Sequence, residues 1–275
     1  MLRSMYSGIS GMKNSQTKLD VIGNNIANVN TFGYKKGRTT FSDLVSQQLA
    51  GATGPGDNRG GVNPRQVGLG SQLSSIDTIH TQGSLQNTGR ELDLGISGDG
   101  FFVVAERDQD GQGEGAESFT RAGNFYLDAN GNIVNSDGLY LLDTDGAPIN
   151  IPDDSQSFSI GSDGTVNIID ADGELADNPV QIGLAKFANP DGLEKIGDNL
   201  YRETANSGEP NDGGNPVVPG TNGTGGLVAG TLEMSNVDLS EEFTEMIVAQ
   251  RGFQANTRII TTSDEILQEL VNLKR

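Results

Sequence analysis

Three copies of an Asp-x-Asp-Gly pattern could bind calcium, because closely spaced carboxylates are the oxygen ligands that calcium prefers. They begin at Asp108, Asp143 and Asp170. An EF-hand calcium loop places oxygen ligands at positions 1, 3 and 5, glycine at position 6 and glutamate at position 12, whereas glycine here falls at position 4 and no glutamate matches. Asp-Gly also suits type I′ turns. We therefore expect turns, with a secreted calcium-dependent binding module as the alternative.

Groups for catalysis are few. The chain has no cysteine and a single histidine, His80, beside Ile79 in an expected strand. Lack of cysteine excludes disulfides, thiolate zinc sites and cysteine nucleophiles, and no serine lies in a strand-turn-helix nucleophile elbow. Gly98-Asp99-Gly100 lacks the third glycine of a dinucleotide motif, and residues 223–230 lack the lysine of a P-loop. We expect no catalytic residue, no metal and no cofactor, and hence no enzyme.

Charge is distributed unevenly along the 275 residues, whose net charge is −19. Residues 1–90 contain nine basic and four acidic residues, residues 91–215 contain five and 25, and residues 216–275 contain four and eight. The carboxylate excess argues against nucleic acid, which requires clustered lysine and arginine. No run of 18 apolar residues and no secretory signal is present, so we expect neither membrane insertion nor a cleaved signal peptide.

Both ends of the chain show the three-and-four spacing of amphipathic helices. Each such helix buries a stripe and needs a partner, which is the other helix, another copy of the chain or a sheet of the same subunit. Asp238 is the expected N-cap of the second helix, with Glu241 reaching back as in a capping box. The N-terminal stripe is Leu2, Met5, Ile9, Met12, Gln16, Leu19, Gly23 and Ile26, and the C-terminal stripe is Leu239, Phe243, Met246, Gln250, Phe253, Thr257, Ile260, Asp264, Leu267 and Val271.

Between these helices, short apolar runs alternate with glycine next to aspartate or asparagine, which is typical of antiparallel strands and hairpin turns. Clear examples are residues 101–104 and 166–169, with turns expected at Asp137-Gly138, Asp145-Gly146 and Asp163-Gly164. Residues 50–61 and 206–226 are rich in glycine and proline, so we expect mobile loops or linkers there. Residues 108–117 are expected to form an exposed acidic hairpin tip.

Residues 24–35 read NNIANVNTFGYK and resemble the signature of the bacterial flagellar rod and hook axial proteins. Residues 235–275 resemble the C-terminal motif of that family, and residues 88–104 and 121–138 resemble its β-domain motifs. The asparagines follow the last apolar turn, where their side chains can bond to nearby backbone, and Gly33 permits a sharp exit that Phe32 and Tyr34 can anchor. A helix cap alone needs one asparagine or glycine and not this cluster.

The resemblance implies a mainly β fold with α-helical termini. The N- and C-terminal helices, in residues 1–35 and 236–275, would pair as a coiled coil and form the polymerisation domain lining an inner tube. Residues 36–89 and 204–235 would form an extended, glycine-rich linker and β-hairpin region. Residues 90–203 would form an outer all-β domain.

The implied function is that of a structural subunit that polymerises into a helical tube and transmits torque. Residues 76–80, the run SFSIGSDGTVNI and the C-terminal residues look most like the short hook proteins of Gram-positive bacteria, which favours the hook, the flexible joint of the flagellum. The alternative is the straight distal rod of the basal body, in which residues 42–70 would stiffen contacts between subunits.

The implied partners are further copies of the chain, the neighbouring axial proteins of the rod, hook cap and hook–filament junction, and the flagellar export apparatus. The implied location is the hook or basal body of the flagellum, reached without a cleaved signal peptide. The expected polymer-interface residues come from the two helices and the asparagine-rich motif. They are Leu2, Met5, Ile9, Met12, Leu19, Asn24, Asn25, Ile26, Ala27, Asn28, Asn30, Thr31, Gly33, Phe243, Met246, Gln250, Phe253, Asn256, Ile260, Leu267 and Val271.

Overall fold

In a computed structural model that describes residues 2–56, 59–106, 115–152, 155–170, 173, 175 and 179–273, the chain forms two compact units. Unit 1 consists of Met1–Ala27, Gly37–Thr78 and Asp238–Arg275, and unit 2 consists of Asn28–Lys36 and Ile79–Val237. The chain therefore passes between the units four times, always at described residues. The three-part division expected from the sequence remains a prediction.

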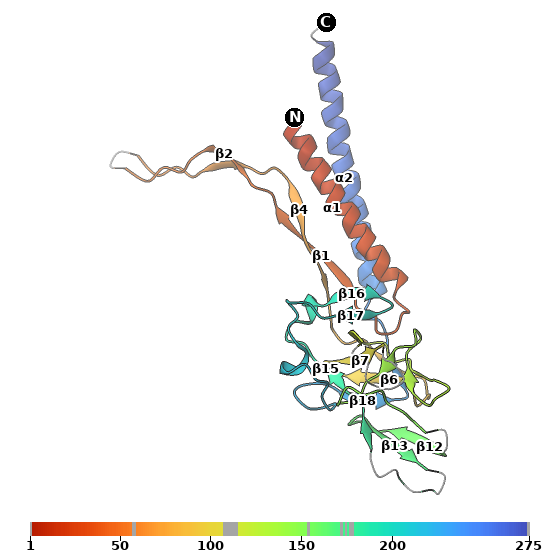
Figure 1. The fold of residues 1–275 in the computed structure, drawn as a ribbon. Coiled ribbons are helices and arrows are strands. Elements are labelled where there is room, and N and C mark those ends of the chain that lie inside the picture. Colours follow the sequence, from red (N-terminus) through yellow and green to blue (C-terminus); the bar gives the residue numbers. More distant parts are fainter. Residues whose placement is uncertain are drawn as a thin grey trace. The chain divides into compact units, whose positions relative to one another are not determined.

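Unit 1 contains the two terminal helices, α1 (Leu2–Ala27) and α2 (Leu239–Asn272), which pack side by side and antiparallel (Figure 1). Their polar contacts join Met12 to Thr257 and Lys18 to Glu245, so positions rise along one helix as they fall along the other. These contacts confirm the expected pairing of the terminal helices. Neither helix is long and apolar enough, over its described residues, to cross a membrane.

The start of α2 is defined by a local cap. The Asp238 carboxylate accepts a hydrogen bond from the Ser240 amide at 2.8 Å, which confirms the expected N-cap. Glu241 and Glu242 lie in the first turn, where negative charge interacts favourably with the helix dipole. The helix start is therefore encoded within five consecutive residues.

Unit 1 also contains a long antiparallel ribbon, in which β1 (Gly37–Asp43) pairs with β4 (Ser71–Thr78) and β2 (Gln47–Ala50) pairs with β3 (Arg65–Val67). The Asn14 amide of α1 donates to the Ser71 hydroxyl at 2.8 Å, so α1 also contacts this ribbon. Backbone bridges continue the ribbon into residues 50–61, where the sequence predicts a mobile loop or linker within a β-hairpin region. Pairing extends into this glycine-rich segment because antiparallel backbones can hydrogen-bond through glycine without help from side chains.

Unit 2 is built around an eight-stranded antiparallel sheet with the order β16-β17-β8-β7-β11-β10-β9, in which β15 also pairs with β7. Smaller sheets join β12-β13-β14, β18-β6 and β19-β5. The strands are β5 (Leu85–Asn87), β6 (Leu94–Ser97), β7 (Phe101–Ala105), β8 (Glu117–Thr120), β9 (Tyr126–Leu127), β10 (Ile133–Val134), β11 (Tyr140–Leu141), β12 (Ser157–Ile160), β13 (Thr165–Ile169), β14 (Val180–Gln181), β15 (Leu184–Ala185), β16 (Glu194–Gly197), β17 (Leu200–Arg202), β18 (Gly226–Ala229) and β19 (Thr231–Glu233), and short 3-10 helices span Pro190–Gly192 and Pro210–Asp212.

Strand β7 is the centre of unit 2, because all five of its side chains are buried. Phe102 and Val104 point into one hydrophobic cluster, whereas Phe101, Val103 and Ala105 point into another. A strand covered on both faces reads as a continuous apolar run. The sequence therefore predicts a strand at residues 101–104. The strand-rich unit 2 and the two terminal helices confirm the expected mainly β fold with helical termini.

The expected hairpin turns exist, but their type differs from the prediction. A type I′ turn needs positive φ at two successive residues. At residues 138, 146 and 164 only the glycine has positive φ, and its amide donates to the residue three positions earlier. The type I′ conformation occurs instead at Asp198-Asn199, between β16 and β17, where both residues have positive φ.

Two further expectations concern irregular segments. Residues 206–226 are not an unpacked linker, because Ser207 and Thr224 are buried and Val217 forms a backbone bridge with Leu184. Glycine and proline there shape a loop that packs within unit 2.

The acidic tip expected at residues 108–117 lies mostly outside the described residues, as do the whole first Asp-x-Asp-Gly copy and part of the third. In the second copy, the Asp143 carboxylate accepts hydrogen bonds from the amides of Asp145 and Ala147, both at 2.8 Å.

Candidate assembly helices and the buried network

Small residues line the contact between α1 and α2. A Cβ atom added at Gly8 would lie 3.3 Å from Ile260 Cγ1, and one added at Gly11 would lie 2.7 Å from Asn256 Nδ2. On the other helix, a Cβ atom at Gly252 would lie 3.4 Å from Ser15 Oγ. The backbones approach closely because these positions have no side chain or a very short one.

This close contact uses only part of the expected stripes. The half-buried members are Met5, Met12, Leu19, Ile26, Met246, Phe253, Thr257, Ile260 and Leu267, and Asn256 is half-buried against Gly11. The exposed members are Ile9, Gln16, Gly23, Leu239, Phe243, Gln250, Asp264 and Val271. The side chain of Leu2 is outside the described part of the chain. The helices therefore meet along one part of each apolar stripe and along the neighbouring glycine and serine positions, which permit a close approach.

Large apolar side chains on both helices consequently remain exposed. The exposed fraction reaches 70% at Tyr6, 50% at Phe243 and 67% at Val271. Apolar side chains that gather on a surface mark sites of protein association. The exposed apolar residues of the helices are Tyr6, Ile9, Leu239, Phe243, Ile247, Val248, Ile259, Ile266, Leu270 and Val271.

The asparagine-rich motif begins with a buried junction inside unit 1. The side-chain amide of Asn25 donates to the Gly37 carbonyl and its oxygen accepts from the Gly37 amide, both at 2.9 Å. The same Nδ2 lies 3.2 Å from Glu242 Oε2, which is also buried. Asn25 therefore joins the last turn of α1, the start of β1 and the first turn of α2. The sequence stripes did not reveal Glu242, because a glutamate in a first turn is normally exposed.

The rest of the motif has a more local role. Thr31 Oγ1 donates to the side-chain oxygen of Asn28 at 3.1 Å, while Asn24, Ala27 and Asn30 are exposed. Gly33 has φ +69°, and its amide donates to the Glu233 carbonyl at 2.8 Å. A Cβ atom at Gly33 would lie 2.6 Å from the backbone of Arg121 and Ala122. Gly33 is thus required both for its conformation and for close packing.

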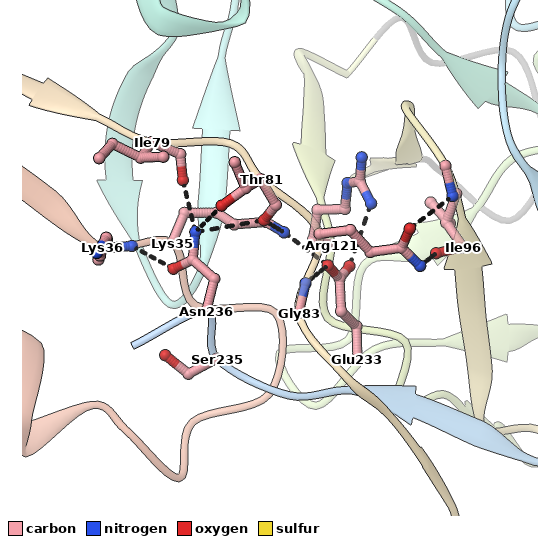
Figure 2. A network of polar contacts seen from close by, with 12 residues as sticks. Lys35, Lys36, Ile79, Thr81, Gly83, Ile96, Arg121, Glu233, Ser235 and Asn236 are labelled. Carbon is pink, nitrogen blue, oxygen red and sulfur yellow. Dashed lines mark hydrogen bonds and ion pairs between the residues drawn. The ribbon is translucent and has the colours of Figure 1, made fainter. Parts of the chain in front are cut away.

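A buried ion-pair network follows directly after Gly33 in unit 2 (Figure 2). Lys35 Nζ lies 2.6 Å from Glu233 Oε1, and Arg121 Nη1 lies 3.2 Å from Glu233 Oε2. The Gly83 amide also donates to Glu233 Oε1, at 2.9 Å. Burial lowers the pKa of Lys35, and the adjacent Glu233 carboxylate opposes that shift. Buried pairs of this kind tolerate loss of one partner poorly.

Asn236 adds a second junction to this network (Figure 2). Its side-chain oxygen accepts from the Lys36 amide and its Nδ2 donates to the Ile79 carbonyl, each at 2.8 Å. Ile79 and Lys36 are also joined by a backbone hydrogen bond of 2.9 Å. Residues at or next to three of the four passages between the units are therefore hydrogen-bonded to one another.

His80 lies beside this network, within 5.6 Å of the ring centre of Phe101 and 5.5 Å of that of Tyr201. Burial lowers the pKa of His80 to about 4, and the positive charges of Lys35, Arg121 and Lys195 act in the same direction. Burial raises the pKa of Tyr201. No group of three or more histidine, aspartate or glutamate side chains is arranged to hold a metal among the residues that the structure describes.

These features define a class of protein in which the N- and C-terminal helices pack against each other and expose apolar side chains. A second unit of such a protein is mainly β. Three family models match the chain: "Flagella basal body rod protein" over residues 5–35, "Flagellar hook protein FlgE/F/G D1 domain" over residues 95–168, and "Flagellar basal body rod FlgEFG protein C-terminal" over residues 228–273. Each matched segment supplies one member of the buried trio Lys35, Arg121 and Glu233. The chain belongs to the family of bacterial flagellar rod and hook proteins.

Individual relatives span the full chain. Flagellar basal-body rod protein FlgG of Bacillus subtilis (strain 168) is 62% identical over 275 residues, covering all of both chains. FlgG of Borreliella burgdorferi is 38% identical over 282 residues, and the flagellar hook protein FlgE of the same organism is 32% identical over 453 residues, again covering all of both chains. The family consists of structural components of the flagellum, and the chain is a flagellar protein of this axial type.

Proposed function

We propose that this protein is the subunit of the straight distal rod of the flagellar basal body, and not the hook subunit that the sequence analysis favoured. The observation that supports the rod most strongly is the 62% identity to a rod protein of equal length. Alignment with the hook protein of Borreliella burgdorferi extends over 453 residues, so that protein contains long segments absent from this chain. A structural and not an enzymatic role follows from the same assignment.

The helical pair of unit 1 would form the polymer contacts. Its internal contact is satisfied by small residues, which leaves Tyr6, Phe243 and Val271 exposed for neighbouring copies. Burial of apolar surface is the main driving force for such association. The expected polymer-interface residues of the two helices and the asparagine-rich motif remain part of this proposal, with Asn25 and Gly33 shaping the motif from within.

The remaining partners are proposed on the same basis. The ends of a rod polymer must contact neighbouring axial proteins of the flagellum, and a subunit that assembles outside the cell body requires the flagellar export apparatus. The outer location of residues 90–203 and the inner location of residues 1–35 and 236–275 are likewise proposals. The charge distribution supports this arrangement, because the acidic excess falls within residues 91–215.

Electron microscopy of the assembled protein tests the proposal. Straight tubes are expected for a rod subunit, whereas curved tubes would instead support the hook. Deletion of residues 1–30 or 240–275 should abolish tubes. Because such deletions also remove buried contacts, the substitutions Phe243→Gln and Val271→Gln provide a milder test at exposed positions.

The two substitutions should prevent tube formation while leaving the free energy of unfolding within about 0.5 kcal/mol of the unmodified protein. Leu175→Gln is the matched control, because it also replaces an exposed apolar residue but lies in unit 2. Normal tubes from the double variant, or tubes from the deletion variants, would contradict the helical polymer contacts.

A further inference from the structure

A cavity of about 220 Å³ in unit 2 has no role in the assembly just proposed. Its polar lining includes His80, Arg121, Lys186 and Asp99, and Phe101 and Phe187 form an aromatic wall. One water molecule occupies about 30 Å³ in the liquid. The cavity therefore has room for a group larger than a single water.

Two residues that line this cavity each have a buried nitrogen atom without a hydrogen-bond partner within the described part of the chain, Arg121 Nε and His80 Nδ1. The Arg121 side chain is only 3% exposed, and its Nη1 is engaged by Glu233 (Figure 2). An arginine Nε–H can only donate, so it requires an acceptor. An unmet buried donor of this kind is unfavourable, and more so when it is charged.

Positive charge gathers at the cavity although the surrounding sequence is strongly acidic. Residues 91–215 contain only five basic residues against 25 acidic ones. Three of the five, Arg121, Lys186 and Lys195, lie at the cavity or close enough to His80 to lower its pKa. Of the nearby carboxylates, Glu233 is already paired with Lys35 and Arg121, which leaves Asp99 in the lining.

Lys186 is held in place by the loop opposite. Its Nζ donates to the Gly223 carbonyl at 2.9 Å, and its backbone amide donates to the Asn211 side chain at 2.8 Å. Within the described residues, two further N–H positions of the ammonium group remain for a ligand. The cavity thus combines a fixed cation, an unpaired guanidinium N–H and a neutral imidazole.

We propose that this cavity binds a single oxyanion group, a carboxylate or a phosphate, through Arg121 Nε and His80 Nδ1 as donors and Lys186 as the neighbouring charge. The group has two conceivable sources, a free anion or an acidic side chain of a second copy of the chain. The chemistry of recognition is the same for both. Binding satisfies the two orphan nitrogens and offsets the local positive charge.

His80 provides a clean measurement because it is the only histidine. The full-length protein, labelled with ¹⁵N and dilute, is titrated with inorganic phosphate and separately with acetate while the imidazole resonances are followed by NMR. We expect saturable shifts with a dissociation constant of about 1 mM or below, and a rise of the His80 pKa above its anion-free value, because a bound anion stabilises the imidazolium.

Two variants with the same charge change make the test specific. Lys186→Gln should weaken anion binding about tenfold, whereas Arg202→Gln, at an exposed position of β17, should leave it unchanged. Thermal unfolding of both variants without anion verifies that they fold. Equal weakening by both variants would overturn the site, because it would show only a general effect of charge.

A second series of NMR spectra, recorded without added anion at increasing protein concentration, distinguishes the two sources of the oxyanion group. If an acidic side chain of another copy enters the cavity, the His80 resonances shift with protein concentration, and Lys186→Gln suppresses that shift. Saturable binding of phosphate or acetate to dilute protein indicates a free anion. Absence of both effects up to about 50 mM anion would overturn the proposal and leave water as the occupant of the cavity.

Discussion

One carboxylate, that of Glu233, contacts three separate parts of unit 2. Its oxygens lie 2.6 Å from Lys35 Nζ and 3.2 Å from Arg121 Nη1, and Oε1 also accepts from the Gly83 amide. Its backbone carbonyl accepts from the Gly33 amide. The conformation of Gly33 therefore determines how the lysine two positions later reaches its buried partner.

Replacement of Gly33 by alanine should lower the free energy of unfolding by about 3 kcal/mol. The positive φ disfavours any side chain, and the new Cβ would also clash with the backbone of Arg121 and Ala122. Gly138→Ala is the control, because Gly138 has φ +84° but no atom within 4 Å of an added Cβ. It should cost about 1 kcal/mol in chemical denaturation. Equal losses for the two variants would refute the close contact.

His80 should make folding less favourable as the pH falls. Its pKa is lowered from 6.5 to about 4 in the folded protein, so the unfolded chain binds the proton more readily between these values. The stability due to neutral His80 is complete above pH 6.5 and is lost as the pH falls through about 4. The loss is about 3 kcal/mol.

The measurement compares the unmodified protein with His80→Phe, which keeps an aromatic ring beside Phe101 and Tyr201. Urea unfolding is followed from pH 4 to pH 7 in a buffer without phosphate or carboxylates. The difference in stability between the two proteins should change by about 3 kcal/mol across this range. A constant difference would show that His80 is protonated equally well in both states.

At the scale of elements, the packing of α1 against α2 depends on positions without side chains. Gly8→Leu should lower the free energy of unfolding by about 2 kcal/mol, because Gly8 is buried and an added Cβ would already lie 3.3 Å from Ile260. Gly23→Leu lies on the same helix with open space around it and should raise stability by up to about 1 kcal/mol. Circular dichroism during denaturation measures both, and matching effects would show that the helices do not meet at Gly8.

Elements set by local chemistry could be read from the sequence, and contacts between distant segments could not. The cap at Asp238 and the buried run of β7 depend on a few consecutive residues. The spacing of apolar residues revealed that each terminal helix has a stripe, but glycine and serine at the actual contact carry no apolar signal. Lys35 and Glu233 are separated by 198 positions, and nothing in either local sequence indicates that both are buried.

At the scale of the whole molecule, we propose the ribbon of unit 1 as a second surface for contacts between subunits. Its exposed apolar residues include Leu49 at 62% and Val62 at 52%. In a rod, residues 42–70 are expected to stiffen the contacts between subunits, and this remains a proposal. Exposed apolar side chains are the part of the ribbon that neighbouring copies would bury.

Leu49→Gln with Val62→Gln should leave the stability of the subunit within about 0.5 kcal/mol, because both side chains are exposed. In assembled tubes the same change should reduce straightness, measured as persistence length by electron microscopy. Gln48→Ser on β2 serves as a polar control at an exposed position. If the double variant forms tubes of unchanged persistence length, the apolar side chains of the ribbon do not stiffen the tube.

The four passages of the chain between the units would determine how a subunit of the proposed rod carries a mechanical load. A single linker would place two domains in series, so that one peptide segment bears the whole tension. Here four peptide segments connect the units, and residues at or next to three of these connections, Lys36, Ile79 and Asn236, are joined by hydrogen bonds. A tension between the units would therefore be divided among parallel connections. If one connecting segment lengthens under load, the other three would still hold the two units together.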